Sequence, residues 1–140
     1  MIRLKTILSL SILGLAAPLT ISALDAPKVA IEKPADVIQA SKARDHIDMT
    51  ITVELTVKSS KNADKQMRYY LDSEVDYKAD QNLALVITYD SAKDFEKAGI
   101  KDIIAHFSDK TIRATGKVIR ESDQTRIYIT EAKQIQMVKK

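Results

Sequence analysis

The chain has 140 residues, which is enough for one ordinary domain and too few for two of comfortable size. It contains 22 Lys and Arg residues, 19 Asp and Glu residues and no cysteine, so disulfide scaffolds and thiol chemistry are excluded. A net charge of +3 is also too small to identify a nucleic-acid-binding protein by its charge alone.

Residues 1–23 have the pattern of a secretory signal peptide. Arg3 and Lys5 precede an apolar run over residues 7–17, Pro18 interrupts it, and the small pair Ser22-Ala23 follows. The run is shorter than the roughly 20 residues of a membrane-spanning helix, so a cleaved leader is favoured over an anchor. We therefore expect a periplasmic or secreted protein, cut near Ala23. Removing Arg3 and Lys5 leaves 20 basic against 19 acidic residues.

Residues 24–43 are predicted to form an extended or partly helical lead-in. They contain Pro27 and Pro34 and lack a strong apolar period. Proline is tolerated in the first turn of a helix, so a short helix can begin at Pro34. No domain core is expected in this segment.

Three strands are expected next. Over residues 49–57, hydrophobic side chains alternate strictly with Thr and Glu, which predicts one buried and one solvated face. Residues 59–66 are polar and predict a loop, and residues 67–72 predict a second strand with Met67, Tyr69 and Leu71 inside. After an acidic loop over residues 72–82, residues 83–89 predict a third strand buried on both faces.

A short helix is expected between the third and fourth strands. Asp90 and Ser91 are suitable N-cap residues, and Gly99 is a suitable stop. Phe95 and Ile100 have the spacing of the hydrophobic contact that accompanies such a stop. Residues 103–107 predict a further helical turn.

Two more strands complete the predicted order. Residues 112–118 alternate around Gly116, which suggests a bulge or bend, and residues 121–124 predict a turn. Ile127 and Ile129 share the buried phase of the fifth strand, and a tail through residues 135–137 is expected to pack back onto the body.

This order, from residue 44 to 138, resembles the small OB-fold domains of exported bacterial proteins, which are related to nucleic-acid-binding OB-fold families. The similar segments are Asp45-His46-Ile47, Thr52-Val53-Glu54, Tyr70-Leu71-Asp72-Ser73-Glu74 with Asp76-Tyr77, Lys110-Thr111-Ile112-Arg113 with Thr115-Gly116-Lys117-Val118, and Gln134-Ile135. The resemblance implies a mainly β, five-stranded barrel with a short helix between strands three and four.

The chain departs from the resembling domains at two places. Asp48 stands where they usually carry glycine. Residues 122–126 replace a turn of Gly-Arg-Pro-Glu type. That turn forms one wall of the usual ligand site, so the resemblance transfers a fold but no ligand contact.

Neither an enzyme nor a metal site is predicted. The chain has two histidines, His46 and His106, and no glycine-rich phosphate loop or Gly-x-Ser-x-Gly motif. The acidic residues Asp72, Glu74, Asp76 and Asp80 resemble half of a calcium loop. Tyr77 occupies the place of its glycine, and Leu83 that of its closing glutamate, so a solvated turn is favoured.

A binding surface is the leading functional interpretation. OB-folds that hold single strands combine stacking aromatics with flanking cations. The residues that match this chemistry are Lys58, Lys65, Arg68, Tyr70, Arg126 and Tyr128. Two alternatives stay open: a module for single-stranded nucleic acid or another anionic polymer, and an envelope-associated interaction or structural factor without such a ligand. Solvated lysines that protect strand edges give the same pattern.

Overall fold

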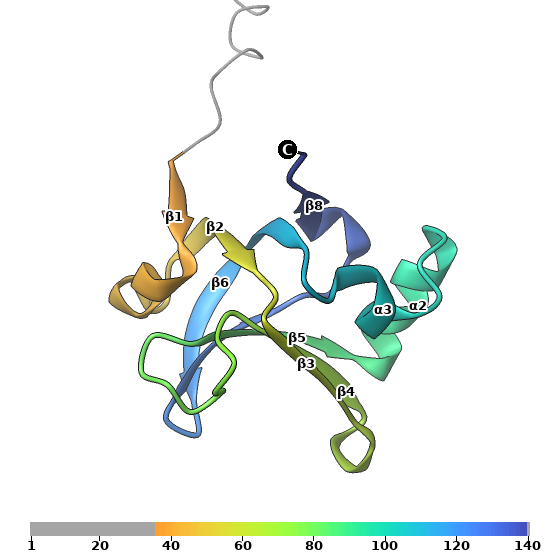
Figure 1. Cartoon of the computed structure of the whole chain (residues 1–140), viewed down its shortest axis with the longest axis horizontal. Helices are drawn as coiled ribbons and strands as arrows, with labels where there is room; N and C mark the ends of the chain where they lie inside the picture. Colours follow the sequence, from red (N-terminus) through yellow and green to blue (C-terminus); the bar gives the residue numbers. More distant parts are fainter. Residues whose placement is uncertain (1–35, 140) are drawn as a thin grey trace, which may run out of the picture. The chain divides into compact units, whose positions relative to one another are not determined.

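The computed structural model describes residues 36–139, which form a mainly β unit with a few short helices (Figure 1). The expected leader, residues 1–23, and most of the expected lead-in lie outside the described residues. The eight strands, in chain order, are β1 (Val37–Gln39), β2 (Thr50–Thr56), β3 (Ser59–Ala63), β4 (Arg68–Asp72), β5 (Leu83–Thr88), β6 (Thr111–Glu121), β7 (Gln124–Tyr128) and β8 (Ile135–Met137).

The helices are short and lie between strands. The α-helices are α2 (Tyr89–Lys97) and α3 (Ile103–Phe107), and both come between β5 and β6, as the sequence predicts. Within residues 36–139, three 3-10 helices complete the order: η2 (Ala40–His46), η3 (Asp64–Gln66) and η4 (Ala132–Gln134).

The strand pairing runs β1-β2-β6-β7-β5-β4-β3, and β8 pairs with β6. The β5–β7 pair is parallel, as is β1–β2, and the other pairs are antiparallel. The strand order therefore places β5 between β4 and β7, two strands that are far apart in the sequence.

The expected closed, five-stranded barrel is wrong in strand number and in closure. The first expected strand breaks after β2, because the backbone N–H of Val57 donates to Lys110 whereas that of Lys58 donates to Asp72. The chain thus changes partner within two residues, from β6 to β4. Residues 59–63, expected to be a loop, form β3, whose polar side chains suit the edge of a sheet.

Two short strands extend the sheet beyond the five that were expected. Val37–Gln39, within the expected lead-in, pairs with β2 as β1, and η2 follows it. Ile135–Met137 packs back onto the body as β8, antiparallel to β6. Met67, expected inside, is 61% exposed because it stands in a left-handed turn with φ of 56°.

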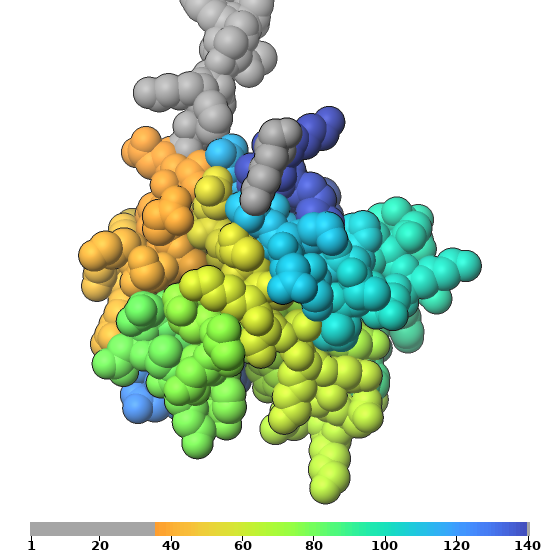
Figure 2. All heavy atoms as spheres, viewed as in Figure 1, coloured from red at the N-terminus to blue at the C-terminus, as the bar shows by residue number. Residues whose placement is uncertain are grey.

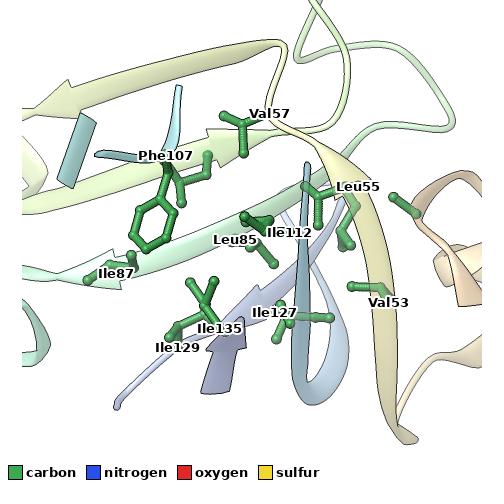
Figure 3. Packing of buried hydrophobic residues seen from close by; sticks show 14 of the residues in the cluster. Val53, Leu55, Val57, Leu85, Ile87, Phe107, Ile112, Ile127, Ile129 and Ile135 are labelled. Carbon is green, nitrogen blue, oxygen red and sulfur yellow. The ribbon is translucent and has the colours of Figure 1, made fainter. Parts of the chain in front are cut away.

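The core fills the space between the strands and the two α-helices (Figure 3). Leu83, Leu85 and Ile87 of β5 are buried together with Ala84 and Val86, so this strand is buried on both faces as predicted. Phe95 of α2 packs edge to face with Phe107 of α3, with ring centres 6.0 Å apart.

Gly116 is required by a close approach rather than by a bulge. A Cβ atom at this position would lie 2.6 Å from Cγ2 of the buried Ile127 on the neighbouring strand. Gly99 is required by its backbone conformation and not by a close approach. Its φ is +91°, and the Ile100 N–H donates to Phe95 O at 2.9 Å, as expected for the predicted helix stop.

Candidate functional site

Four of the six predicted site residues lie on one face of the sheet. Arg68 and Tyr70 alternate on β4, and Arg126 and Tyr128 alternate on β7. Tyr70 pairs with Val86 of β5, and Val86 pairs in turn with Tyr128 of β7. The side chains of these alternating residues of β4 and β7 therefore lie on the same face of the sheet, on either side of β5.

The four long side chains cover the strand between them. Val86 and Ala84 belong to the same face but are 0% and 1% exposed. Two guanidinium groups lie over tyrosine rings, Arg126 at 5.4 Å from the ring centre of Tyr70 and Arg68 at 5.6 Å from that of Tyr128. The face is therefore an interlocked layer of cations and aromatics.

Glu121, at the end of β6, connects these groups. Its Oε1 accepts hydrogen bonds from Arg126 Nη1 at 2.6 Å and from the Tyr128 hydroxyl at 2.7 Å. Arg68 Nη1 donates to the same hydroxyl at 2.9 Å. Glu121 was expected to lie in a turn, so its part in this site was not predicted.

The network shifts the pKa of Glu121 and that of Tyr128 in opposite directions. The hydrogen bonds from Tyr128 and Arg126 hold the pKa of Glu121 below its ordinary range, so this carboxylate stays ionised. Burial and the hydrogen bond to Glu121 raise the pKa of the Tyr128 phenol. Glu121 offsets part of the positive charge of the two arginines, which lowers the charge that the face offers to an anionic ligand.

Each of the two arginines has one buried donor atom without a hydrogen-bond partner in the described part of the chain. Arg68 Nε and Arg126 Nε are buried and have no hydrogen-bond partner among residues 36–139. The Arg126 side chain is only 11% exposed. The layer is therefore well packed but not fully hydrogen-bonded from within.

The two predicted lysines lie apart from this layer. Lys58, at the break between β2 and β3, pairs with Glu74 at 3.5 Å. Lys65 is exposed in η3, in the connection between β3 and β4. The structure thus brings together four of the six predicted residues, and their binding of a ligand stays a prediction.

Two adjoining hollows flank the layer. The first, of about 200 Å³, is lined by Ser59, Lys61, Gln66, Tyr70, Asp72, Tyr77, Gln124 and Arg126. The second, of about 290 Å³, shares Tyr77 and Gln124 with it and lies between the 77–82 loop and the β6–β7 turn. In Figure 1 this green loop and the blue turn lie beside each other, and Figure 2 shows a notch between the green loop and the β3–β4 hairpin.

The loop that walls both hollows is anchored by a buried polar network. Asn82 Nδ2 donates to Asp72 Oδ1 at 2.9 Å, and Asn82 Oδ1 accepts from the Glu74 N–H at 2.9 Å. The Leu83 N–H donates to Ser73 Oγ at 2.8 Å. These bonds fix both ends of residues 73–82, so Tyr77 is carried on an anchored loop.

Asp72 is the buried charge of this region. It is 5% exposed, and burial raises the pKa of its carboxyl group, while the hydrogen bond from Asn82 and the charge of Arg126 oppose that rise. From the sequence, Asp72 was expected to lie in a solvated acidic turn. Its burial was not foreseen because charged residues at strand ends are usually exposed.

Within residues 36–139, no three His, Cys, Asp or Glu side chains are grouped as metal ligands. His46 Nδ1 lies 3.1 Å from the Lys42 carbonyl oxygen, and His106 packs edge to face on Phe107 with ring centres 4.7 Å apart. The same part of the chain contains no helix with the length and hydropathy of a membrane span.

Comparisons with known proteins bear on the fold. No protein-family model matches the chain, and no curated protein does. A putative aspartyl-tRNA synthetase from Leishmania major Friedlin is similar, with a TM-score of 0.51, 10% identity, 85% of this chain covered and 26% of that one. OBody AM1L10 bound to hen egg-white lysozyme is similar at a TM-score of 0.51 and 12% identity, over 78% of this chain and 99% of that one.

The fold is OB-like. At these low identities the likeness concerns the path of the backbone, and it transfers no residue role. The chain spans about a quarter of the synthetase chain that it matches.

Proposed function

We propose that this chain is an exported, non-enzymatic OB-type module that binds single-stranded nucleic acid or another anionic polymer. One observation carries the proposal: Arg126 is stacked on Tyr70 at the wall of a hollow that also contains the exposed Tyr77 and the flexible cation Lys61. Stacking surfaces beside cations are what single-strand binding by OB-folds requires.

The two hollows suggest the path of such a ligand. An extended strand that enters over Tyr70 reaches Tyr77, which is 51% exposed and lines both hollows, and then meets Arg120 and Lys78 in the second. Each base has a π face, so two tyrosines serve several sequences. Because Glu121 offsets part of the arginine charge, the lysines are expected to supply most of the phosphate contacts.

Fluorescence anisotropy with labelled oligo(dC) tests this proposal. For about three phosphate contacts to a single strand, the logarithm of the binding constant should fall with the logarithm of salt concentration with a slope of about −2. The variant Lys61→Glu with Tyr77→Ala should abolish binding, whereas Lys133→Glu, on an 80% exposed side chain outside both hollows, should not. Absence of wild-type binding at low salt would remove the proposal.

Export is the second part of the proposal, and the leader pattern of residues 1–23 supports it. Expression of the full chain in a bacterium with an outer membrane, followed by fractionation, tests it. We expect a shortened protein in the periplasmic fraction or the medium whose first residue follows Ala23 or a near neighbour. A full-length protein in the cytoplasm would contradict export.

A protein-binding role is the second candidate. It is favoured by a separate hollow of about 270 Å³ beside α2, which is lined by Ile100 and by the tilted aromatic pair Tyr69 and Tyr89, whose ring centres are 5.2 Å apart. Tyrosine and aliphatic side chains are common anchors of protein interfaces. A pull-down from envelope extract with wild type and Ile100→Glu tests it: a partner lost only in the variant supports this role, and no stable partner contradicts it.

A further inference from the structure

The smaller hollow is lined by a carboxylate, Asp72, whose hydrogen-bonding capacity is only partly used. Asp72 shares the outward phase of β4 with Tyr70 and lines the 200 Å³ hollow, yet its residue is only 5% exposed. A buried carboxylate is costly unless hydrogen bonds compensate it. A ligand that bonds to this carboxylate would account for a charged group at this position.

Anchoring the loop uses only one oxygen of this carboxylate. Asn82 Nδ2 donates to Asp72 Oδ1, and within residues 36–139 Oδ2 has no hydrogen-bond donor. A neutral amide would supply the same single acceptor to Asn82 at a lower cost of burial. The second oxygen is thus a surplus acceptor in a side chain that lines the hollow.

The other residues of this hollow suit a flat, polar ring. Tyr70 and Tyr77 supply aromatic surfaces. The amide oxygens of Gln66 and Gln124 accept from Tyr70 and Arg126, so these two side chains offer their amide N–H groups to a ligand. Single-stranded bases are recognised by stacking on aromatic rings together with hydrogen bonds to their Watson–Crick edges. A carboxylate accepts from the amino group of cytosine but repels the carbonyl oxygen that uracil presents at the same position.

We propose that this hollow receives one unstacked base bearing an exocyclic amino group, and that Asp72 Oδ2 accepts a hydrogen bond from that group. The inference deepens the proposed function and rests on it. Tyr70, Tyr77 and the neighbouring cations give affinity for a single strand, and Asp72 gives a preference for bases that carry an amino group. Burial raises the pKa of Asp72, as expected for a carboxyl group recessed in a hollow. Cytosine is then preferred to uracil.

Matched oligo(dC) and oligo(dU) probes test the preference at neutral pH, because their bases differ only at the amino or carbonyl group and the adjoining ring nitrogen. We expect the wild type to bind oligo(dC) about tenfold more tightly, which lies within the range for one base contact. Asp72→Asn should reduce this ratio to about twofold or reverse it, since its amide donates to a carbonyl and its Oδ1 still accepts from Asn82.

Two controls separate recognition from stability. Asp76→Asn alters a carboxylate of the same loop that lines neither hollow and should keep the wild-type ratio. The second control is an oligo(dC) whose bases are N4,N4-dimethylcytosine, which have no donor hydrogens on the amino nitrogen. It should bind the wild type as weakly as oligo(dU) does, and it tests the contact without changing the protein.

The outcomes distinguish this inference from the proposed function. Equal binding of oligo(dC) and oligo(dU) by the wild type, or a preference that survives both Asp72→Asn and N4 dimethylation, overturns the role of Asp72 and leaves single-strand binding in place. Failure to bind any of the three probes at low salt overturns the proposed function and this inference with it.

Discussion

The guanidinium group of Arg126 lies 5.4 Å from the ring centre of Tyr70 while its Nη1 donates to Glu121 at 2.6 Å. The two residues come from β7 and β4, which do not pair with each other, so the contact crosses the buried Ala84 of β5. The ion pair fixes the cation, and the cation fixes one side of the ring. The stacking surface is therefore ordered before any ligand arrives.

Replacement of Arg126 by lysine tests this contact. Lysine keeps the charge but loses the planar fork that bonds Glu121 and Gln124 and stacks on Tyr70. We expect Arg126→Lys to lower the free energy of unfolding by about 1–2 kcal/mol in urea titrations. Arg113→Lys is the control, because the Arg113 side chain is 38% exposed in its pair with Glu54, against 11% for Arg126, and it should cost less than about 0.5 kcal/mol. Equal losses would contradict the assigned role.

The lowered pKa of Glu121 predicts a pH-dependent stability. Its folded-state pKa lies below the ordinary value of 4.5, so the stabilisation is complete above that value and is lost as pH falls through the folded-state pKa. Thermal melts of wild type and Glu121→Gln should therefore differ at neutral pH, with wild type more stable, and converge under acid conditions. A difference that grows on acidification would show that the sign is wrong.

Asp72 contributes in the opposite direction. Burial raises its folded-state pKa, so stability from this group is greatest below the unfolded pKa and falls as pH rises through the folded-state value. Asp72→Asn should accordingly melt at or above the wild-type temperature at neutral pH, and the two curves should meet in acid. A markedly less stable variant at neutral pH would mean that the ionised carboxylate holds the loop.

The N-cap of α2 is Thr88, one residue before the helix, and not the expected Asp90 or Ser91. The Thr88 side chain accepts from the Ser91 N–H at 3.1 Å. We expect Thr88→Ala to destabilise the protein by about 1 kcal/mol. Asp90→Ala removes an almost fully exposed partner of Lys93 and should cost less than about 0.5 kcal/mol. Chemical denaturation of the two variants measures both values, and the reverse order would return the cap to Asp90.

Gly116 offers a double-mutant test of the packing between β6 and β7. Gly116→Ala places a methyl group 2.6 Å from Cγ2 of Ile127 and should cost about 1–3 kcal/mol. The same change made in an Ile127→Ala background should cost clearly less, because the obstructing methyl group is gone. Equal costs in the two backgrounds would locate the penalty in the backbone instead.

Alternating hydrophobicity predicted the strands that have a buried phase. The apolar phase of β2 and the continuous apolar run of β5 are direct consequences of burial on one face and on two. β3 was missed because Ser59–Ala63 is a polar edge strand held by backbone hydrogen bonds to β4. The barrel was predicted closed because the change of partner at Val57 and Lys58 leaves no mark in the hydrophobic pattern.

The site was partly predictable because alternation along a strand also shows which side chains share a face. Arg68 with Tyr70 and Arg126 with Tyr128 each share a strand phase, so their common face followed once β4 and β7 were placed on either side of β5. Glu121 and Asp72 were missed because each ends a strand, where sequence favours a solvated turn. The left-handed φ values of Ser122 and Asp123 agree with the turn expected over residues 121–124. Asp48 is also left-handed, which suits a position where the resembling domains usually carry glycine.

Mapping of the ligand onto the folded protein tests the central claim most directly. In a titration of the isotopically labelled protein with oligo(dC) at low salt, we expect the largest amide chemical-shift changes at Lys61, Tyr70, Asp72, Tyr77 and Gln124, which share one hollow. The signals around α2 should stay nearly unchanged. Shifts that gather instead at Tyr89 and Ile100, or no shifts at a large excess of the oligonucleotide, would contradict the account.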